Sequence, residues 1–154
     1  MRRISTCFFA LILVFLASSA IAQSNRVGTF DRQSIVVAYY RSPQWAATLK
    51  EKQAELQAAK QANDQQKVHE LEGWGGEVQE LASDQLAGTA PIDSIIDALQ
   101  PAFTEIRKSA KVTNIVPCPC ADITALKVDV TPQLLDWLKA DANTRKIIEG
   151  LPHK

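Results

Sequence analysis

The most reactive residues in this chain are the two cysteines of Pro117-Cys118-Pro119-Cys120. Two thiols could act in redox exchange, bind a soft metal ion or link two protomers. A disulfide across a single residue closes a small, strained and therefore reducible ring. Two thiolates without a neighbouring histidine also make an incomplete zinc site. We therefore predict a loop in which Cys118 and Cys120 could form a disulfide, locally or between protomers, without a catalytic role.

No other set of residues in the sequence points to catalysis. His69 stands between Val68 and Glu70 in a helix-forming segment, where we expect a solvated side chain. The sequence contains no Ser/His/Asp pattern, no glycine-rich phosphate loop and no paired carboxylates in apolar surroundings. We predict that the protein is not an enzyme and uses no cofactor or metal. Thiol-redox activity at Cys118 and Cys120 is the enzymatic alternative.

The beginning of the chain has the pattern of a secretory signal peptide. Arg2-Arg3 are basic, Phe8 to Leu16 form an apolar stretch, and Ala20-Ile21-Ala22 fit a small-x-small cleavage site. The apolar stretch is shorter than the roughly 20 residues that span a membrane. We predict cleavage of residues 1–22 and export to the periplasm, with an uncleaved anchor as the alternative.

The chain that remains after cleavage is nearly neutral. The signal holds two of the 17 basic residues and none of the 17 acidic ones, so the mature chain has a net charge of −2. A nucleic-acid-binding protein needs a basic surface, and this class is therefore excluded. The mature length suits a single domain, and an exported protein can keep disulfides.

A long helix-forming segment, Pro43 to Lys111, lies between β-branched runs at residues 26–30 and 112–116. Apolar residues in its first half recur at spacings of three, four or seven, which predicts one apolar stripe as in a coiled coil. Asn63-Asp64 interrupts this pattern with residues that favour turns. We expect the segment to fold back on itself, with the tip of a hairpin at Ala62 to Gln65.

Local signals divide this segment further. Ser42-Pro43 supplies an N-cap and a proline at the first helical position. The glycines of Gly73 to Gly76 weaken a helix and offer a rival tip, but the apolar spacing continues across them, so we favour a weakened or kinked helix. Gly88 to Pro91 and Pro101 are further weak points. Residues 92–110 are more apolar than the arm before them, which predicts a buried root.

The sequence therefore predicts an α+β fold with a small β-strand head and a protruding antiparallel helical hairpin. We expect a third strand at Ile123 to Leu126 and a closing helix that begins with Thr131 as N-cap and Pro132 at the first position. The expected parts are the head (23–42 and 91–140), the helical arm (43–90) and a polar tail (141–154) that holds at most a helical turn near Lys146 to Glu149.

In this order the parts resemble the Skp/OmpH family of periplasmic chaperones, over nearly the whole mature chain. Val27 to Asp31, followed by Ser34 to Val36, looks like the first strand and helix of the family. Pro91 to Val116 is similar to the helix that returns into its second strand. Val128 to Thr131, with the leucines that follow it, looks like the start of its last helix. The likeness lies in the order of these loose motifs.

The resemblance implies an ATP-independent holdase without enzymatic activity, a homotrimer whose head is built from β-strands and whose arms surround a cavity. Unfolded outer-membrane or envelope proteins would be its clients, and it could contact the membrane peripherally. The arm is shorter than is typical and holds four lysines against eight acidic residues. A structural or adaptor coiled-coil protein of the envelope is the alternative.

Two groups of residues are the candidates for these contacts. Trp45 and Trp74 could bind clients, because amphipathic aromatic residues favour interfaces, although arm-to-arm packing is an equal use for them. The predicted client-binding residues are Trp45, Leu49, Leu56, Val68, Leu71, Trp74 and Val78. The predicted residues of the oligomer head are Val27, Phe30, Ile115 and Val116.

Overall fold

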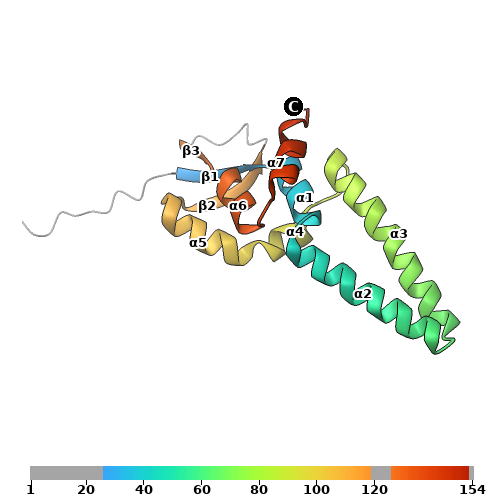
Figure 1. Cartoon of the computed structure of the whole chain (residues 1–154). Coiled ribbons are helices and arrows are strands. Elements are labelled where there is room, and N and C mark those ends of the chain that lie inside the picture. The colour runs from blue at the N-terminus through green and yellow to red at the C-terminus, as the bar shows by residue number, and fades with distance from the viewer. Residues whose placement is uncertain (1–25, 119–125, 153–154) are drawn as a thin grey trace, which may run out of the picture.

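The computed structural model describes residues 26–118 and 126–152. These residues form helices and a small parallel sheet, in agreement with the predicted α+β class (Figure 1). The elements in chain order are β1 (Arg26–Asp31), α1 (Arg32–Tyr40), α2 (Pro43–Gln61), α3 (Gln65–Ala87), α4 (Asp93–Ala98), α5 (Gln100–Ala110), β2 (Asn114–Cys118), β3 (Leu126–Asp129), α6 (Thr131–Trp137) and α7 (Ala142–Glu149).

The three strands form a parallel sheet in the order β2-β1-β3. Gly28 is the point of closest approach in its centre, because a Cβ there would lie 3.0 Å from the Ile115 side chain. β2 begins and ends two residues later than the predicted run, so it includes Pro117 and Cys118, which we had expected in a loop. Proline is tolerated there because β2 is an edge strand, where a missing N–H need not break a ladder bond.

The core of the head lies between this sheet and helices α1, α4, α5, α6 and α7. The predicted root of the arm contributes much of it: Ile92, Ile95, Leu99, Phe103 and Ile106 are all buried. The helix breaks at Leu99 instead of at Pro101, which occupies the first turn of α5 and needs no hydrogen-bond partner for its nitrogen.

Helices α2 and α3 project from the head as a helix pair and diverge from a short turn at their far end (Figure 1). The turn lies within the predicted tip, and Asn63 adopts a φ of 55° there, as an asparagine tolerates. α3 continues without interruption through Gly73 to Gly76, so the rival tip is excluded. Its carboxyl end returns to α1, where the Tyr40 hydroxyl donates a hydrogen bond of 2.9 Å to Oε1 of Gln85.

Local signals account for the ends of both helices. The Ser42 hydroxyl accepts a hydrogen bond of 3.2 Å from the Trp45 amide, and Asp64 accepts one of 3.0 Å from the Lys67 amide. α3 ends at Gly88, whose φ of 88° is the left-handed conformation that a glycine C-cap adopts readily. These caps satisfy donors and acceptors that a helix leaves open at its ends.

Three features near the carboxyl end differ from the prediction. β3 begins at Leu126, where the predicted third strand ends; residues 123–125 lie outside the described ranges. Thr131 is the first residue of α6 and not its N-cap: its hydroxyl accepts a hydrogen bond of 2.9 Å from the Asp31 amide, across the sheet. The predicted polar tail forms α7, because Thr144 and Ile148 are buried against the rest of the head.

Candidate binding cleft

A cleft of about 240 Å³ opens between α2 and α3, and we call it the arm cleft. Its walls are mainly apolar, with the stems of longer polar side chains at the rim. The lining residues are Leu49, Lys52, Gln53, Leu56, Leu71, Glu72, Trp74 and Gly75. Sites of this kind bind through apolar contact and exclusion of water.

The helices meet closely near their turn and separate toward the head. Ala59 and Leu71 are the two buried apolar residues of the pair, and the ion pair between Lys60 and Glu72, 3.0 Å long, joins the helices near the same end. Gly75 forms part of the opposite wall, and a Cβ built there meets no atom within 4 Å. The space beside Gly75 is therefore open and is not filled by another side chain of the described structure.

An aromatic cluster of Tyr39, Tyr40, Trp45 and Trp74 bounds the cleft on the side of the head. The ring centroids of Trp45 and Trp74 are 6.3 Å apart, and those of Trp45 and Tyr40 are 5.0 Å apart in an edge-to-face arrangement. Such pairs add about 0.5–1.5 kcal/mol beyond the burial of their area. Burial raises the pKa of Tyr39, and burial with the neighbouring Tyr39 raises the pKa of Tyr40.

A second, more polar hollow of about 400 Å³ adjoins the arm cleft and shares Lys52, Leu71 and Trp74 with it. The residues that line it are Lys52, His69, Glu70, Leu71, Gly73, Trp74 and Glu77. We call it the acidic hollow, because two glutamates stand in its wall. Nζ of Lys52 lies 6.0 Å from the centroid of the Trp74 ring, within the distance at which an aromatic face attracts a cation.

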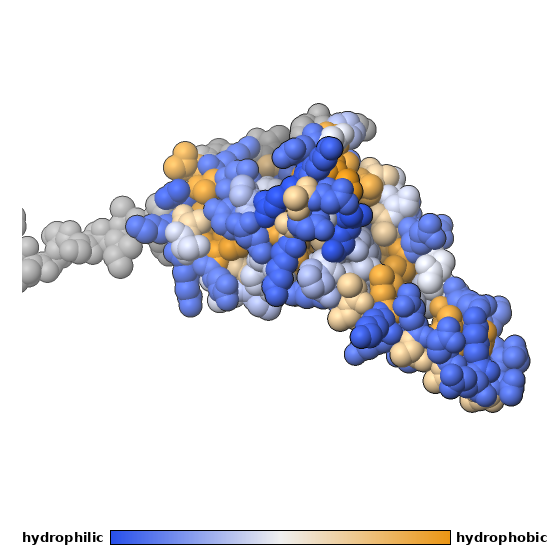
Figure 2. Space-filling model, viewed as in Figure 1, coloured by the Kyte–Doolittle hydropathy of each residue, from blue (hydrophilic) through white to orange (hydrophobic). Residues whose placement is uncertain are grey.

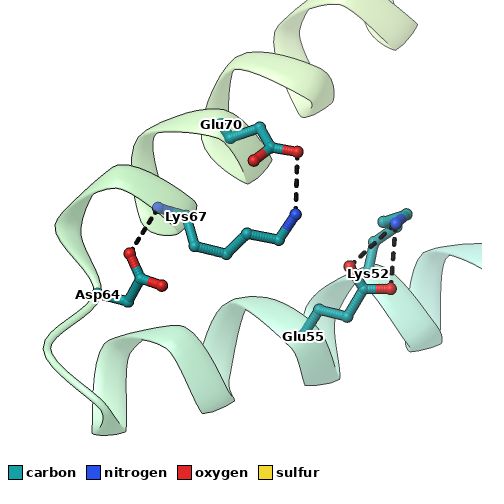
Figure 3. A network of polar contacts seen from close by, with 5 residues as sticks. All are labelled: Lys52, Glu55, Asp64, Lys67 and Glu70. Carbon is teal, nitrogen blue, oxygen red and sulfur yellow. Dashed lines mark hydrogen bonds and ion pairs between the residues drawn. The ribbon is translucent and has the colours of Figure 1, made fainter.

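Two ion pairs on the helix pair lie within one helix, as Figure 3 shows for Lys52 with Glu55 and for Lys67 with Glu70. The distances are 3.0 Å and 2.9 Å, and the hydrogen bond to Glu70 raises the pKa of Lys67. Exposed pairs at such spacing contribute little to stability. They leave the surface toward the tip largely hydrophilic, with small hydrophobic areas between the polar side chains (Figure 2).

The structure brings most of the predicted client-binding residues together. Leu49, Leu56, Leu71 and Trp74 line the arm cleft, and Trp45 contacts the Trp74 ring. Val68 and Val78 are half-buried on α3 and lie outside the lining of the cleft. His69 is exposed, as predicted.

The predicted oligomer head is placed differently. Phe30 is 1% exposed and Ile115 is buried, both within the chain's own core, where the Phe30 ring lies 6.1 Å from that of Phe103. These two side chains are therefore not available to a partner, which corrects the prediction. Val27 and Val116 are half-buried. A β-branched strand residue can serve either an internal core or an interface, and sequence alone does not distinguish them.

Cys118 ends β2, in register with Asp31 of β1. It lines a hollow of about 150 Å³ together with residues of α1 and of the end of α3. Cys120 lies outside the described residues, so the predicted disulfide stays a prediction. Over the parts of the chain that the structure describes, no group of three or more histidine, cysteine or acidic side chains could hold a metal ion. In those parts, no helix is both long and apolar enough to cross a bilayer.

Sequence reasoning missed a group of polar contacts of Arg32, Tyr40 and Gln85 that joins the end of α3 to the head, and we call it the polar latch. Nη2 of Arg32 donates to the main-chain carbonyls of Gln85, at 3.3 Å, and of Ala90. Gln85 is buried, receives the Tyr40 hydroxyl and donates from Nε2 to the Pro91 carbonyl at 2.8 Å. The latch thereby supplies donors to main-chain carbonyls in the last turn of α3 and just after it, where the helix itself offers none. A glutamine in an exposed-looking helix carries no local sign of such burial.

The chain matches no protein-family model, and comparisons with curated proteins and with solved structures find no match either.

Proposed function

We propose that this chain is a periplasmic, ATP-independent holdase that keeps unfolded outer-membrane or envelope proteins from aggregating. The observation that carries the proposal is the arm cleft: an apolar surface held open between two helices, away from the core of the head. Unfolded membrane-protein chains expose apolar strands that would otherwise pair with one another. A cleft with many weak apolar contacts can cover such a strand and release it without chemical energy.

Three parts of this proposal extend the predictions made from the sequence. The signal peptide would deliver the chain to the periplasm, where ATP is absent. The helix pair would serve as the arm of a Skp/OmpH-like coiled-coil hairpin. Assembly into a trimer would place three arms around one client and multiply weak contacts. Each helix is short for this task, since the 19 residues of α2 span about 28 Å.

The test is suppression of aggregation. A denatured outer-membrane β-barrel protein is diluted from urea with and without the mature chain, and light scattering is followed at a stoichiometric ratio. We expect strong suppression by the natural chain and at least a severalfold weaker effect of the double variant Leu49→Gln/Leu56→Gln. Both substitutions replace residues that line the cleft and keep a good helix former.

The matched control is the double variant Leu81→Gln/Ile147→Gln, which removes two apolar side chains that are 41% and 39% exposed and lie outside the cleft. It should suppress aggregation as the natural chain does. Circular dichroism checks that both variants fold. Equal loss in both would mean that general surface hydrophobicity, and not the cleft, holds the client.

The same arrangement could serve an adaptor that docks a folded partner. Retention of a folded envelope protein on the immobilised chain, with no suppression of aggregation, would favour this alternative. The mass of the protein in solution gives an independent check on assembly, because the holdase proposal expects a trimer. A monomer would have no cavity shared between three arms.

A further inference from the structure

The charge around the arm cleft is unbalanced. The helix pair and the short segment after it hold four lysines and eight acidic residues. Three of these lysines, Lys52, Lys60 and Lys67, are already held in ion pairs with glutamates of the same helix pair. Glu51, Glu77 and Glu80 make no ion pair with any other residue that the structure describes. The surface therefore has spare negative charge.

Part of this charge, the Glu77 carboxylate, lies beside the apolar walls, whereas the nearby Glu70 and Glu72 are paired with Lys67 and Lys60. Glu72 stands at the rim of the arm cleft, and Glu70 and Glu77 stand in the wall of the acidic hollow, which shares Trp74 with the cleft. Lys52 already occupies the cation-attracting position near Trp74. The apolar arm cleft and the acidic hollow thus adjoin each other at Lys52, Leu71 and Trp74, and one ligand can reach both.

The size of the cleft limits what can fill it. A volume of about 240 Å³ is below the roughly 300–1,000 Å³ of typical small-molecule sites. It suits a few side chains of a longer chain better than a complete small ligand. In an extended chain, alternate side chains point the same way and lie roughly 7 Å apart, so an apolar residue and a charged one can enter adjoining hollows.

We propose that the arm cleft selects extended apolar segments flanked by lysine or arginine. This inference rests on the proposed holdase function and deepens it by naming the chemistry of the client segment. The apolar residues enter the arm cleft, and in the acidic hollow the basic residues meet Glu77, which has no ion pair with any described residue. They also compete with Lys67 and Lys60 for the exposed Glu70 and Glu72. A second copy of the same helix pair is a poor occupant, because it would bring the same excess of negative charge.

The test compares two synthetic peptides with one identical apolar core of alternating leucine and tyrosine, flanked by three lysines or by three glutamates. Each carries a dye, and fluorescence anisotropy measures its affinity for the mature chain at low salt. We expect the lysine-flanked peptide to bind about tenfold more tightly, because like charges repel the other one. The ratio should fall toward one at 1 M salt, where the Debye length is about 3 Å.

The double variant Glu70→Gln/Glu77→Gln locates the effect. It should lower the affinity for the lysine-flanked peptide severalfold and leave the glutamate-flanked one unchanged or slightly tighter. The matched control, Glu105→Gln/Glu149→Gln, changes the net charge equally on exposed positions of α5 and α7 in the head. It should leave the ratio of affinities unchanged.

Several outcomes would overturn the inference, and they differ from failure of the holdase proposal. Equal affinity for both peptides at low salt would remove charge selection while leaving the holdase role intact. If neither peptide binds, the inference is wrong, and the aggregation assay decides the holdase role separately. A fall in the mass of the protein on peptide binding would assign the cleft to a second copy and overturn the inference as well. The comparison of salt concentrations needs only the natural chain, so a variant that fails to fold does not prevent the test.

Discussion

The head and the helix pair are stabilised in opposite ways. The head buries apolar side chains from a sheet and five helices in one core, including Leu99 and Leu134, which are both 0% exposed. Within the helix pair, Ala59 and Leu71 are the apolar side chains that are buried. The pair is held instead by helix caps, by aromatic contacts at its base and by the hydrogen bonds of Gln85, while its exposed ion pairs add little. An apolar surface therefore stays open on the pair.

The largest expected effect lies in the core of the head. Leu99→Ala should lower the free energy of unfolding by about 2–5 kcal/mol, because it removes buried methyl groups and leaves a cavity. Leu49→Ala in the arm cleft, where the leucine is 37% exposed, should cost under about 1 kcal/mol. Urea unfolding followed by circular dichroism measures both. Similar losses in the two variants would show that the arm contributes to a common core.

The junction between the two regions should respond next. Gln85→Leu leaves the Tyr40 hydroxyl and the Pro91 carbonyl without their partner, which should cost about 1–3 kcal/mol. Amide hydrogen exchange should rise at the carboxyl end of α3 and less in the core of the head. Gln79→Leu, at an exposed position of the same helix, is the control and should leave exchange nearly unchanged. Unaltered exchange in Gln85→Leu would mean that the latch does not hold the arm.

Within the arm, stability should follow local propensity. Gly76→Ala should stabilise the chain by about 0.5–1 kcal/mol, because a Cβ at that helical position meets no atom within 4 Å. Gly88→Ala should instead destabilise it, since its φ of 88° strains any residue with a Cβ. Thermal unfolding of the two variants gives the comparison. Destabilisation by Gly76→Ala would point to a role for this glycine that the single chain does not display.

The smallest expected effect concerns α7, the helix that the polar end of the chain forms and packs on the head. Hydrogen bonds from Thr144, and then the charge of Arg41, hold the pKa of Asp141 below its usual 3.8. A lowered folded pKa contributes stability above pH 3.8 that is lost as the pH falls through the folded value. The protection factors of the α7 amides, each taken relative to the intrinsic exchange rate at the same pH, should therefore fall on acidification. Asp141→Asn keeps an N-cap side chain without a charge and should weaken the pH dependence of α7. If the variant and the natural chain respond to acid alike, other carboxyl groups cause the response.

How far the sequence predicted the fold depends on the range of the interactions. The start of α2 at Ser42-Pro43, the turn around Asn63 and the end of α3 at Gly88 agree with local signals. The prediction of Thr131 as an N-cap was wrong, and α7 is longer than the helical turn predicted near Lys146 to Glu149, because distant contacts decided both. The Thr131 hydroxyl accepts from Asp31, 100 residues earlier, and α7 packs on α1.

The candidate site shows the same division. Periodic spacing selected Leu49, Leu56, Leu71 and Trp74, which the structure brings together in one cleft. It could not separate them from Val68 and Val78, because a helical stripe is wider than the part that a partner helix leaves open. The family resemblance placed Phe30 and Ile115 at an interface, although the chain's own core buries them.

The sequence by itself determined where the helices of the arm begin and end and which of their faces is apolar, because caps and periodicity act over a few residues. The tertiary structure alone decided the parallel order β2-β1-β3, the burial of Gln85 and the open cleft beside Trp74. Each of these depends on residues far apart in the chain, and only the packed fold fixes how close they come.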